Sequence, residues 1–512
     1  MTTLGAAADA GQPPAIRLKQ PAGRWVILAT VLGSSMAMLD GTVVNVALPT
    51  IGRDLHTSLS GLQWTVNAYT LTLAGLILLG GSLGDRMGRR RIFLTGVVWF
   101  ALASALCGVA PDIGVLIAAR ALQGIGGALL TPGSLAIIQA SFDADDRPRA
   151  VGAWSGLGGV AGAAGPLLGG WIVSGVGWRW VFLLNLPLAA VVIAVATRHV
   201  PETRDPSAHG RFDIAGAVLA AAALAGISYA LIEAPGRGAG PQVTVAAVAG
   251  VAAFAGFLAV ERHRGRSEHG TPPMLPLDVF TSRQFTVVNI VTFVVYAAFG
   301  AVFFLLVLQL QVVSGFSPLQ AGTALLPSTL LMLALSARAG MLAQRTGPRW
   351  LMAGGTLISA AGLLLMTRIG PHASYVADVL PAVCVFGFGL SMTVAPLTAT
   401  VLASADARHA GMASGVNNAV ARSAGLLAVA GLPAAVGLAI GGHSAPAFAS
   451  GFRTAMVICA CLLVAGSLLS GLFVDNDVLR PAQDEPARQP ECLTNCPVGA
   501  PPLETRGGRA AG

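Results

Sequence analysis

Apolar runs long enough to cross a lipid bilayer recur along the chain, and they limit its fold more than any other feature. They begin at Trp25 and end at Val474, with short charged segments between them. A membrane-spanning helix needs about 20 mainly apolar residues. Charged residues make up only 11% of the 512 residues, against roughly 25% in an ordinary soluble domain. The chain is therefore predicted to be an all-α integral membrane protein, and a soluble globular enzyme is excluded.

The charged segments divide the apolar runs into fourteen predicted membrane spans. No apolar core precedes the first run, so we expect no signal peptide and treat that run as a true span. The predicted spans are 25–48, 62–82, 92–110, 113–138, 150–174, 180–197, 213–232, 243–260, 285–311, 319–338, 351–368, 376–400, 411–440 and 452–474.

Basic residues gather in alternate segments between the spans. Of the 31 Lys and Arg residues, 24 lie in segments on the side of the termini, five lie on the other side, and two, Arg120 and Arg422, lie within spans. Cytoplasmic loops carry the excess of basic residues in membrane proteins, so both termini are predicted to be cytoplasmic. The net charge of +8 is then a consequence of topology, and we expect no nucleic-acid partner.

A repeated loop motif divides the spans into two sets of six. The segment Gly81–Arg91 is echoed 259 positions later by Gly340–Trp350, with Gly, Leu, Arg, Gly and Arg at matching places. Both copies join two spans on the inner side, so the two halves have the same orientation, an arrangement in which the substrate site lies between them. Spans seven and eight have no counterpart and are predicted to form an inserted hairpin. The predicted parts are a cytoplasmic tail (1–23), an N-terminal six-helix bundle (24–197), a linker with the hairpin (198–284), a C-terminal six-helix bundle (285–474) and a disordered cytoplasmic tail (475–512).

Several motifs in the first half resemble those of a known family. They are Leu39–Pro49, Gly81–Arg91, Arg120–Gly124, Gly162–Gly170 and Trp178–Pro187. In this order and at these places they resemble the fourteen-helix drug:proton antiporter branch of the major facilitator superfamily, over residues 24–474. The resemblance implies fourteen transmembrane helices, in two pseudo-symmetric bundles plus an inserted hairpin, and bacterial multidrug efflux coupled to protons.

Asp40, Arg120 and Gln123 are the predicted proton- and substrate-coupling residues, and an ionised Asp40 could also hold a cationic substrate. Asp40 is the only acidic residue well inside a predicted span, where a carboxylate costs on the order of 2.5 to 3.5 kcal/mol. A poorly hydrated carboxyl group exchanges its proton nearer to neutral pH, and a neighbouring guanidinium favours loss of that proton. Asp40 and Arg120 lie at depths that agree within roughly 3 Å, and Gln123 shares a helix face with Arg120. The resemblance assigns this arginine to proton coupling; the alternatives are a hydrogen-bond anchor at Asp40 and a static ion pair.

The loop after the second span is predicted to act as a gating loop. Its residues are Gly81, Asp85, Arg86, Gly88, Arg89 and Arg90. The glycines permit a tight turn, and we expect Asp85 to face the positive start of span thirteen, which the resemblance names as its partner. The motif would then hold an outward-facing state closed on the inner side. The alternative is that its charges only anchor the topology. The second copy has Gln344 in place of the acid, so only the first copy can form a charged latch.

Span five carries a glycine and proline motif. Glycines that recur every three or four residues lie on one helix face and allow another helix to approach closely. The resemblance makes this motif a marker of antiporters, and it is the basis for predicting export. Its members are Gly162, Gly165, Pro166, Gly169 and Gly170.

Polar and aromatic residues at other span positions are candidate contacts of a substrate cavity. Arg422 and the asparagines before it either line the C-terminal half of the cavity or lie at a helix contact, where Arg422 would pair with backbone carbonyls. Aromatic residues at span ends also occur as membrane-interface residues. The candidates are Asn45, Trp64, Asn67, Tyr69, Asn417, Asn418 and Arg422.

The intramembrane charges give a lead on the substrate. Asp40 is one negative charge against the two positive charges of Arg120 and Arg422, and span ten (319–338) contains no Asp or Glu. A dication would meet two repulsive guanidiniums. The cavity is predicted to prefer neutral, monocationic or anionic amphiphiles.

The leading hypothesis is export of lipophilic drugs or antibiotics by alternating access. The chain has no G-x-x-x-x-G-K-[ST] motif, so a proton gradient is the expected energy source, with no cofactor. No metal site is expected, because the eight His are scattered and Cys492 and Cys496 lack further ligands nearby. We expect a monomer in the bacterial cell membrane, with a small lipophilic substrate, protons and the bilayer as partners. The alternatives are a dedicated exporter of one metabolite, a proton-coupled uptake symporter, and a membrane enzyme or sensor, which would need a nucleophile or metal cluster.

Overall fold

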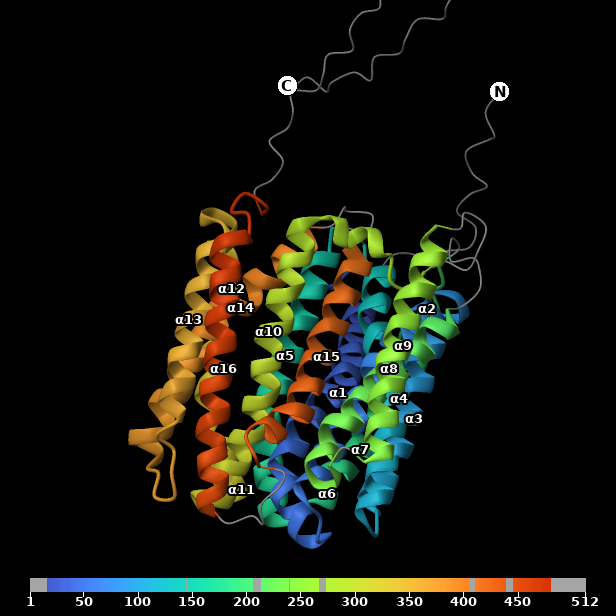
Figure 1. The fold of residues 1–512 in the computed structure, drawn as a ribbon. Helices are drawn as coiled ribbons and strands as arrows, with labels where there is room; N and C mark the ends of the chain where they lie inside the picture. The colour runs from blue at the N-terminus through green and yellow to red at the C-terminus, as the bar shows by residue number, and fades with distance from the viewer. Residues whose placement is uncertain are drawn as a thin grey trace, which may run out of the picture. The chain divides into compact units, whose positions relative to one another are not determined.

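A computed structural model describes residues 16–143, 145–205, 213–238, 240–266, 273–404, 410–438 and 445–479. These residues form helices that run side by side (Figure 1), and one isolated β-bridge joins Ile16 to Phe142. The predicted Cys492 and Cys496 tail and residues 1–15 lie outside the described residues. The helices are α1 (Pro21–Asp54), α2 (Leu59–Met87), α3 (Arg89–Gly108), α4 (Ile113–Ser141), α5 (Arg147–Gly175), α6 (Arg179–Leu183), α7 (Asn185–His199), α8 (Ile214–Arg237), α9 (Pro241–Gly265), η1 (Leu277–Thr281), α10 (Arg283–Leu308), η2 (Gln309–Val313), α11 (Pro318–Ala324), α12 (Leu326–Thr346), α13 (Pro348–Met366), η3 (Tyr375–Val379), α14 (Leu380–Ala403), α15 (Ala410–Ala435) and α16 (Ala445–Phe473).

The predicted membrane spans correspond to helices of the structure. Thirteen helical segments in the described part of the chain are long and apolar enough to cross a membrane, and they coincide with thirteen of the fourteen predicted spans. The remaining predicted span, 411–440, corresponds to α15, which has 26 residues and carries Asn417, Asn418 and Arg422. These side chains lower its hydropathy. The helix packs against α10, α2 and α8, so its polar residues have protein neighbours.

A π-helical turn, η2, ends span nine, and three other predicted spans are interrupted shortly before a proline. Leu184 separates α6 from α7, Leu325 separates α11 from α12, and a π-helical turn, η3, precedes α14. The prolines are Pro187, Pro327 and Pro381. Proline has no N–H group for the bond to the carbonyl four residues earlier. The local sequence therefore explains where these spans bend.

The packing of the helices repeats in the two halves of the chain. In the first half α2 and α3 pack on α4, and α1 packs on α5 and α7; in the second half α12 and α13 pack on α14, and α10 packs on α15 and α16. The inserted pair α8 and α9 pack on each other, and α8 also contacts α2 and α15. The hairpin thus lies at a seam between the two halves. The boundaries given above for the predicted parts stay a prediction.

Contacts near the first and last described residues define one end of the bundle. Leu18 N bonds to Asp146 Oδ2 (3.0 Å) at the start of α5, and Asp475 N bonds to the side chain of Gln284 (3.0 Å) at the start of α10. The ring of Trp25 stacks on His199 at the end of α7. We call this end, where α1 begins and α16 ends, the termini end, and the opposite end the far end.

The repeated loop motif places a left-handed glycine in each half at the termini end. Gly88 has φ +113° and Gly347 has φ +88°, a region that other residues rarely adopt. The third residue after the last helix of each half packs on this glycine: Glu202 follows α7, and Asn476 follows α16. A side chain at either glycine would collide with these groups. The sequence repeat is thus a repeat of backbone geometry.

We expect Gly347→Ala to lower the thermal unfolding midpoint of the purified protein. The left-handed backbone costs a residue with a Cβ roughly 1–2 kcal/mol, and the new methyl group would lie 2.0 Å from Asn476 Oδ1 unless that side chain moves. Gly354→Ala is the matched control, because a Cβ at this helical position meets nothing within 4 Å. Equal midpoints for the two variants would contradict the assigned geometry.

Candidate functional site

Helices α1 and α4 bring together the three residues predicted to couple protons. Arg120 Nη1 forms an ion pair with Asp40 Oδ2 and donates a hydrogen bond to Gln123 Oε1 at 2.5 Å. Gln123 Nε2 donates to Asp40 Oδ1 at 2.8 Å. The side chains of Asp40 and Arg120 are 0% and 1% exposed. Two opposite charges are therefore held together away from solvent, where an unpaired charge would be strongly unfavourable.

Three further residues complete this network, and the sequence analysis missed all of them. Asn185 Nδ2 on α7 lies 3.4 Å from Asp40 Oδ1. Ser104 Oγ on α3 accepts from Gln123 Nε2 at 2.7 Å, and the carbonyl of Thr65 on α2 accepts from Arg120 Nε at 3.0 Å. A signal for Asn185 existed, because it is a polar amide in the segment Trp178–Pro187. No signal marks Ser104 or a backbone carbonyl.

Aromatic rings cover the guanidinium of Arg120. Its Cζ lies 4.4 Å from the centre of the Tyr69 ring and 5.7 Å from that of Phe182, which are favourable cation–π distances. The hydroxyl of Tyr69 donates to the carbonyl of Ala37 at 3.2 Å, so the ring is fixed against α1. Tyr69, a predicted cavity residue, thus packs directly on the ion pair.

The predicted gating loop makes its described contacts within the first half. Asp85 Oδ1 pairs with Arg89 Nη2 at 2.8 Å. The carboxylate of Glu202 accepts from the backbone N–H groups of Arg90 and Arg91 at 3.1 Å, which caps α3, and Arg90 Nη1 bonds to the carbonyl of Val200 at 3.0 Å. The expected contact of Asp85 with the start of span thirteen involves residues up to Gly411, whose side chains lie outside the described residues. That role stays a prediction.

The predicted glycine and proline motif of α5 packs closely against other helices only toward the far end. A Cβ at Gly165 would lie 1.9 Å from Thr42 Oγ1 on α1, and one at Gly169 would lie 2.9 Å from Val43 Cγ1. A Cβ at Gly170 would lie 2.6 Å from the carbonyl oxygen of Pro318 on α11. Gly162 has no such neighbour within 4 Å. The glycines thus permit close approach at Gly165, Gly169 and Gly170.

One face of α5 shows that the halves separate toward the termini end. Residues 152, 156, 159, 166 and 170 follow one another at helical spacing and share this face. At Pro166 and Gly170 it packs on α11, whereas a Cβ at Gly152, Gly156 or Gly159 would meet nothing within 4 Å. The described conformation is therefore closed at the far end and open along α5 at the termini end.

Two glutamine side chains bridge the halves near the far end. Gln63 Nε2 on α2 donates to the carbonyls of Val429 and Ala430 on α15, at 2.6 and 3.1 Å. Gln311 Nε2 donates to the carbonyl of Val46 on α1 at 2.9 Å. These bonds join side chains to backbone across the interface, so they hold the far end closed without any charged pair.

The other candidate cavity residues have different surroundings. Trp64 Nε1 donates to Glu233 Oε1 on α8 at 3.0 Å, so it fastens the inserted hairpin. Asn67 is fully buried, with no hydrogen-bond partner for its amide among the described residues. Asn45 Nδ2 bonds to the carbonyl of Gly41 in its own helix at 3.2 Å. The structure therefore brings none of these three into the coupling network.

The asparagines of α15 divide between a helix contact and an exposed position. Asn417 Nδ2 donates to Thr292 Oγ1 on α10 at 2.8 Å and lies 3.4 Å from Asn289 Oδ1. Asn418 is exposed, and its amide bonds to the carbonyl of Ser414 in its own helix. Arg422 follows Asn418 by one turn and forms no ion pair within the described ranges.

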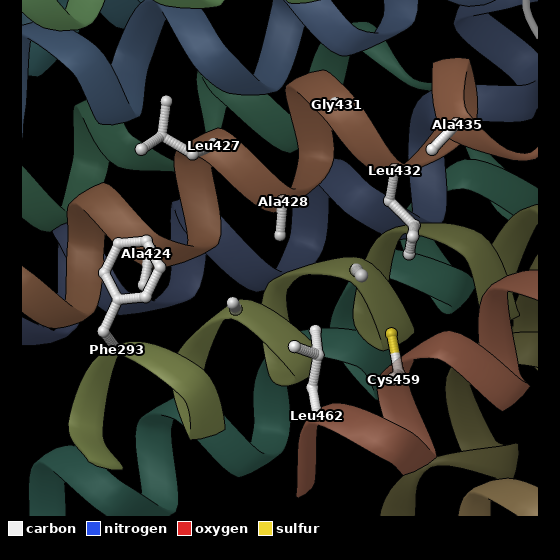
Figure 2. A pocket seen from close by; sticks show the side chains of 11 residues that line it. Phe293, Ala424, Leu427, Ala428, Gly431, Leu432, Ala435, Cys459 and Leu462 are labelled. Carbon is white, nitrogen blue, oxygen red and sulfur yellow. The ribbon is translucent and has the colours of Figure 1, made fainter. Parts of the chain in front are cut away.

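An apolar cavity of about 280 Å³ lies on another face of α15 (Figure 2). Phe293 of α10 and Cys459 of α16 line it opposite Ala428 and Leu432 of α15. None of the predicted site residues lines this cavity. Its walls offer shape and apolar surface but no polar group to orient a substrate.

Two further buried carboxyl groups, those of Glu261 and Asp213, lie near the termini end of the inserted hairpin. Glu261 is 0% exposed and accepts a hydrogen bond from Leu275 N at 2.9 Å. It lies beside the ion pair between Asp213 and Arg264, which caps α8. The sequence analysis missed it because the predicted span ended at residue 260, whereas α9 continues to Gly265.

Known proteins that are similar to this chain match it over most of its length. The family model described as the Major Facilitator Superfamily matches residues 30–429. The chain is 37% identical to the puromycin resistance protein pur8 of Streptomyces alboniger, over 80% of each chain, and 34% identical to the tetracenomycin C resistance and export protein of Streptomyces glaucescens, over 79% of this chain and 74% of the relative. The fold is similar to the crystal structure of a D-xylose–proton symporter, with a TM-score of 0.62, 16% identity, and 88% and 98% of the two chains covered.

We expect Gly322→Ala to widen the distance between the halves at the far end. A Cβ at Gly322 on α11 would lie 2.1 Å from the carbonyl of Pro166, and backbone cannot give way as a side-chain tip can. Electron paramagnetic resonance between spin labels at the exposed positions Val176 and Val376 measures this distance. Gly162→Ala is the control, with nothing within 4 Å of its Cβ. A distribution that stays the same in Gly322→Ala would contradict the close contact of α5 with α11.

Proposed function

Because the chain belongs to the major facilitator superfamily, we propose that it is a secondary transporter that exports lipophilic drugs or antibiotics in exchange for protons. The observation that carries this proposal is the buried network of Asp40, Arg120 and Gln123. It lies in a chain that is similar to resistance and export proteins over four-fifths of its length. The members of this family are transporters, and the proposal includes no enzymatic activity, cofactor or metal.

The protein spans the membrane many times, and we assign the termini end to the cytoplasm of a bacterial cell. This assignment rests on the excess of basic residues in the segments at that end. The described conformation is then inward-facing. We take the working unit to be a monomer in the cell membrane, with the bilayer, protons and a small lipophilic substrate as its partners.

The coupling mechanism follows from the ion pair. With Asp40 ionised, the carboxylate receives donors from Arg120, Gln123 and Asn185, and no solvent reaches it. A proton can bind only when this contact opens. Once Asp40 is protonated, Arg120 loses its counter-charge, and when the pair re-forms the guanidinium drives the proton off. Opening and re-forming of the pair in opposite conformations would couple proton entry to substrate exit.

The gating loop has a separate role in this cycle. In the described conformation Asp85 pairs with Arg89 of its own loop. When the termini end closes, Asp85 would turn to the start of α15, as the sequence analysis predicts. The loop would thus stabilise the outward-facing state and leave the inward-facing state unlatched.

A narrower version of the proposal is export of a single compound. Each of the two relatives named above is called after one antibiotic. Proton-coupled uptake has no comparable support among the observations.

We expect Asp40→Asn to abolish proton-driven efflux while the protein still folds. The amide has the same shape but cannot titrate, and Arg120 keeps its bonds to Gln123 and to the carbonyl of Thr65. Dye accumulation in everted vesicles, driven by an imposed pH gradient, measures this activity. Asp112→Asn is the matched control, because asparagine also caps a helix, as Asp112 does for α4. Wild-type efflux by Asp40→Asn across pH 6 to 8, an interval set about the ordinary physiological range, would remove Asp40 from the coupling mechanism.

We expect Arg120→Lys to lose at least about tenfold in efflux rate, since a pair of this kind is worth a few kcal/mol. The guanidinium contacts Asp40, Gln123 and Thr65 at once, and a single ammonium cannot reproduce that geometry. The same vesicle assay measures the rate, and Arg368→Lys, at an exposed position, is the control. Normal efflux by Arg120→Lys would mean that any positive charge at this position is sufficient for proton coupling.

A further inference from the structure

Arg422 lies on the face of α15 that meets the first half of the chain. Gly415, Asn418 and Arg422 are spaced to share this face. At Gly415 a Cβ would lie 2.8 Å from Leu78 Cδ2 on α2, and farther along α15 the carbonyl of Val429 accepts from Gln63 on α2. Arg422 lies between these two contacts, at mid-helix. It is therefore placed at the interface between the halves and away from the membrane ends.

The charge of Arg422 is not matched by any described carboxylate. Arg120 has Asp40 as its counter-charge, but no ion pair of the described residues includes Arg422. Its Nε is buried and has no hydrogen-bond partner in the described part of the chain. The titratable side chains in its neighbourhood are the phenols of Tyr69 and Tyr296, one from each half. An intramembrane guanidinium in this position is unfavourable unless another group supplies an acceptor.

The contacts around Arg422 fix the helix that carries it, and its side chain is partly exposed. Asn417 fixes α15 to α10 through its bond to Thr292. Gly425, three residues after Arg422, packs against Gly300 of α10 at backbone distance. Asn418 lies on the same face as Arg422 and is exposed. Its amide N–H groups offer hydrogen-bond donors in addition to the guanidinium. Neither contact on α10 occupies the guanidinium.

We propose that Arg422 recognises the charge of the transported molecule, by pairing with a sulfonate, carboxylate or phenolate group of a monoanionic amphiphile. This inference rests on the proposed export function and names the substrate class of the same transport site. A planar guanidinium binds a carboxylate or sulfonate through two parallel hydrogen bonds and can donate to the single oxygen of a phenolate. Tyr69 contacts Arg120 and also lies in the neighbourhood of Arg422. The proton site and the proposed anion site thus share Tyr69 as a neighbour.

Two dyes with the same aromatic skeleton test this proposal. Anilinonaphthalene sulfonate carries one negative charge, and phenylnaphthylamine is its neutral counterpart without the sulfonate. Binding to the purified full-length protein is measured by dye fluorescence, and proton-driven transport is measured in everted vesicles. We expect Arg422→Gln to weaken sulfonate binding roughly tenfold to a hundredfold, the range for one charged hydrogen-bonding contact. Binding of the neutral dye should change less than about twofold, and Arg422→Lys should recover part of the loss.

Matched variants separate a specific effect from general damage. Arg368→Gln removes one positive charge at an exposed position beyond α13 and should leave the binding of both dyes unchanged. Equal weakening of both dyes by Arg422→Gln, or no weakening of sulfonate binding, would overturn the proposal. If neither dye is transported by the wild-type protein but the charge-specific loss of binding is observed, the export function fails and the anion site stands. If both dyes are transported but Arg422→Gln has no charge-specific effect, the export function stands and the anion site fails.

Discussion

The buried ion pair between Asp40 and Arg120 is the interaction on which the first half of the molecule depends. Both charges lie where water cannot compensate them, so every remaining polar atom around them needs a partner. Helices α1, α2, α3, α4 and α7 each supply one, through Asp40, Thr65, Ser104, Arg120 with Gln123, and Asn185. Five helices are thus fixed in rotation and depth around a single pair. A change in its protonation affects all of them.

The second half has the same packing, but its described residues form no such pair. The glycines Gly124 and Gly387 mark matching places in α4 and α14, and the residue four positions earlier is Arg120 in one half and the buried Val383 in the other. Among the described residues, this kind of buried acid–base pair therefore lies in the first half only. The second half contributes Arg422 at the interface and an apolar cavity on another side of α15. The duplicated fold has become two halves with different chemical tasks.

Closure of the far end depends on backbone contacts. Glycines at 165, 169, 170 and 322 let α5 approach α1 and α11 closely, and Gln63 and Gln311 bond to carbonyls across the interface. The inserted hairpin adds to one side only, because α8 packs where α2 and α15 meet and Glu233 holds Trp64. The opposite side, along α5, has no such support and is the side that opens toward the termini end.

Features set by hydropathy and by depth could be predicted from the sequence. The spans follow from apolar runs, the meeting of Asp40 with Arg120 follows from counting residues along two helices, and the matched turns at Gly88 and Gly347 follow from the repeated motif. The rotation of each helix about its axis and the conformational state of the protein could not be predicted from the sequence. Ser104 joins the network because α3 is turned toward α4, and Trp64 contacts Glu233 across 169 positions of sequence. Which end of the bundle is closed depends on an equilibrium of a few kcal/mol, to which no local pattern corresponds.

The central claim is that the Asp40–Arg120 pair opens to take up a proton during transport. Infrared difference spectroscopy of the purified full-length protein tests it most directly, because a protonated carboxyl group absorbs apart from a carboxylate. The account predicts that one component of the protonated-carboxyl band grows as the pH is lowered, decreases when a transported dye binds, and is missing in Asp40→Asn, while the components from other carboxyl groups remain. An Asp40 that stays ionised at every pH at which the protein transports would contradict it.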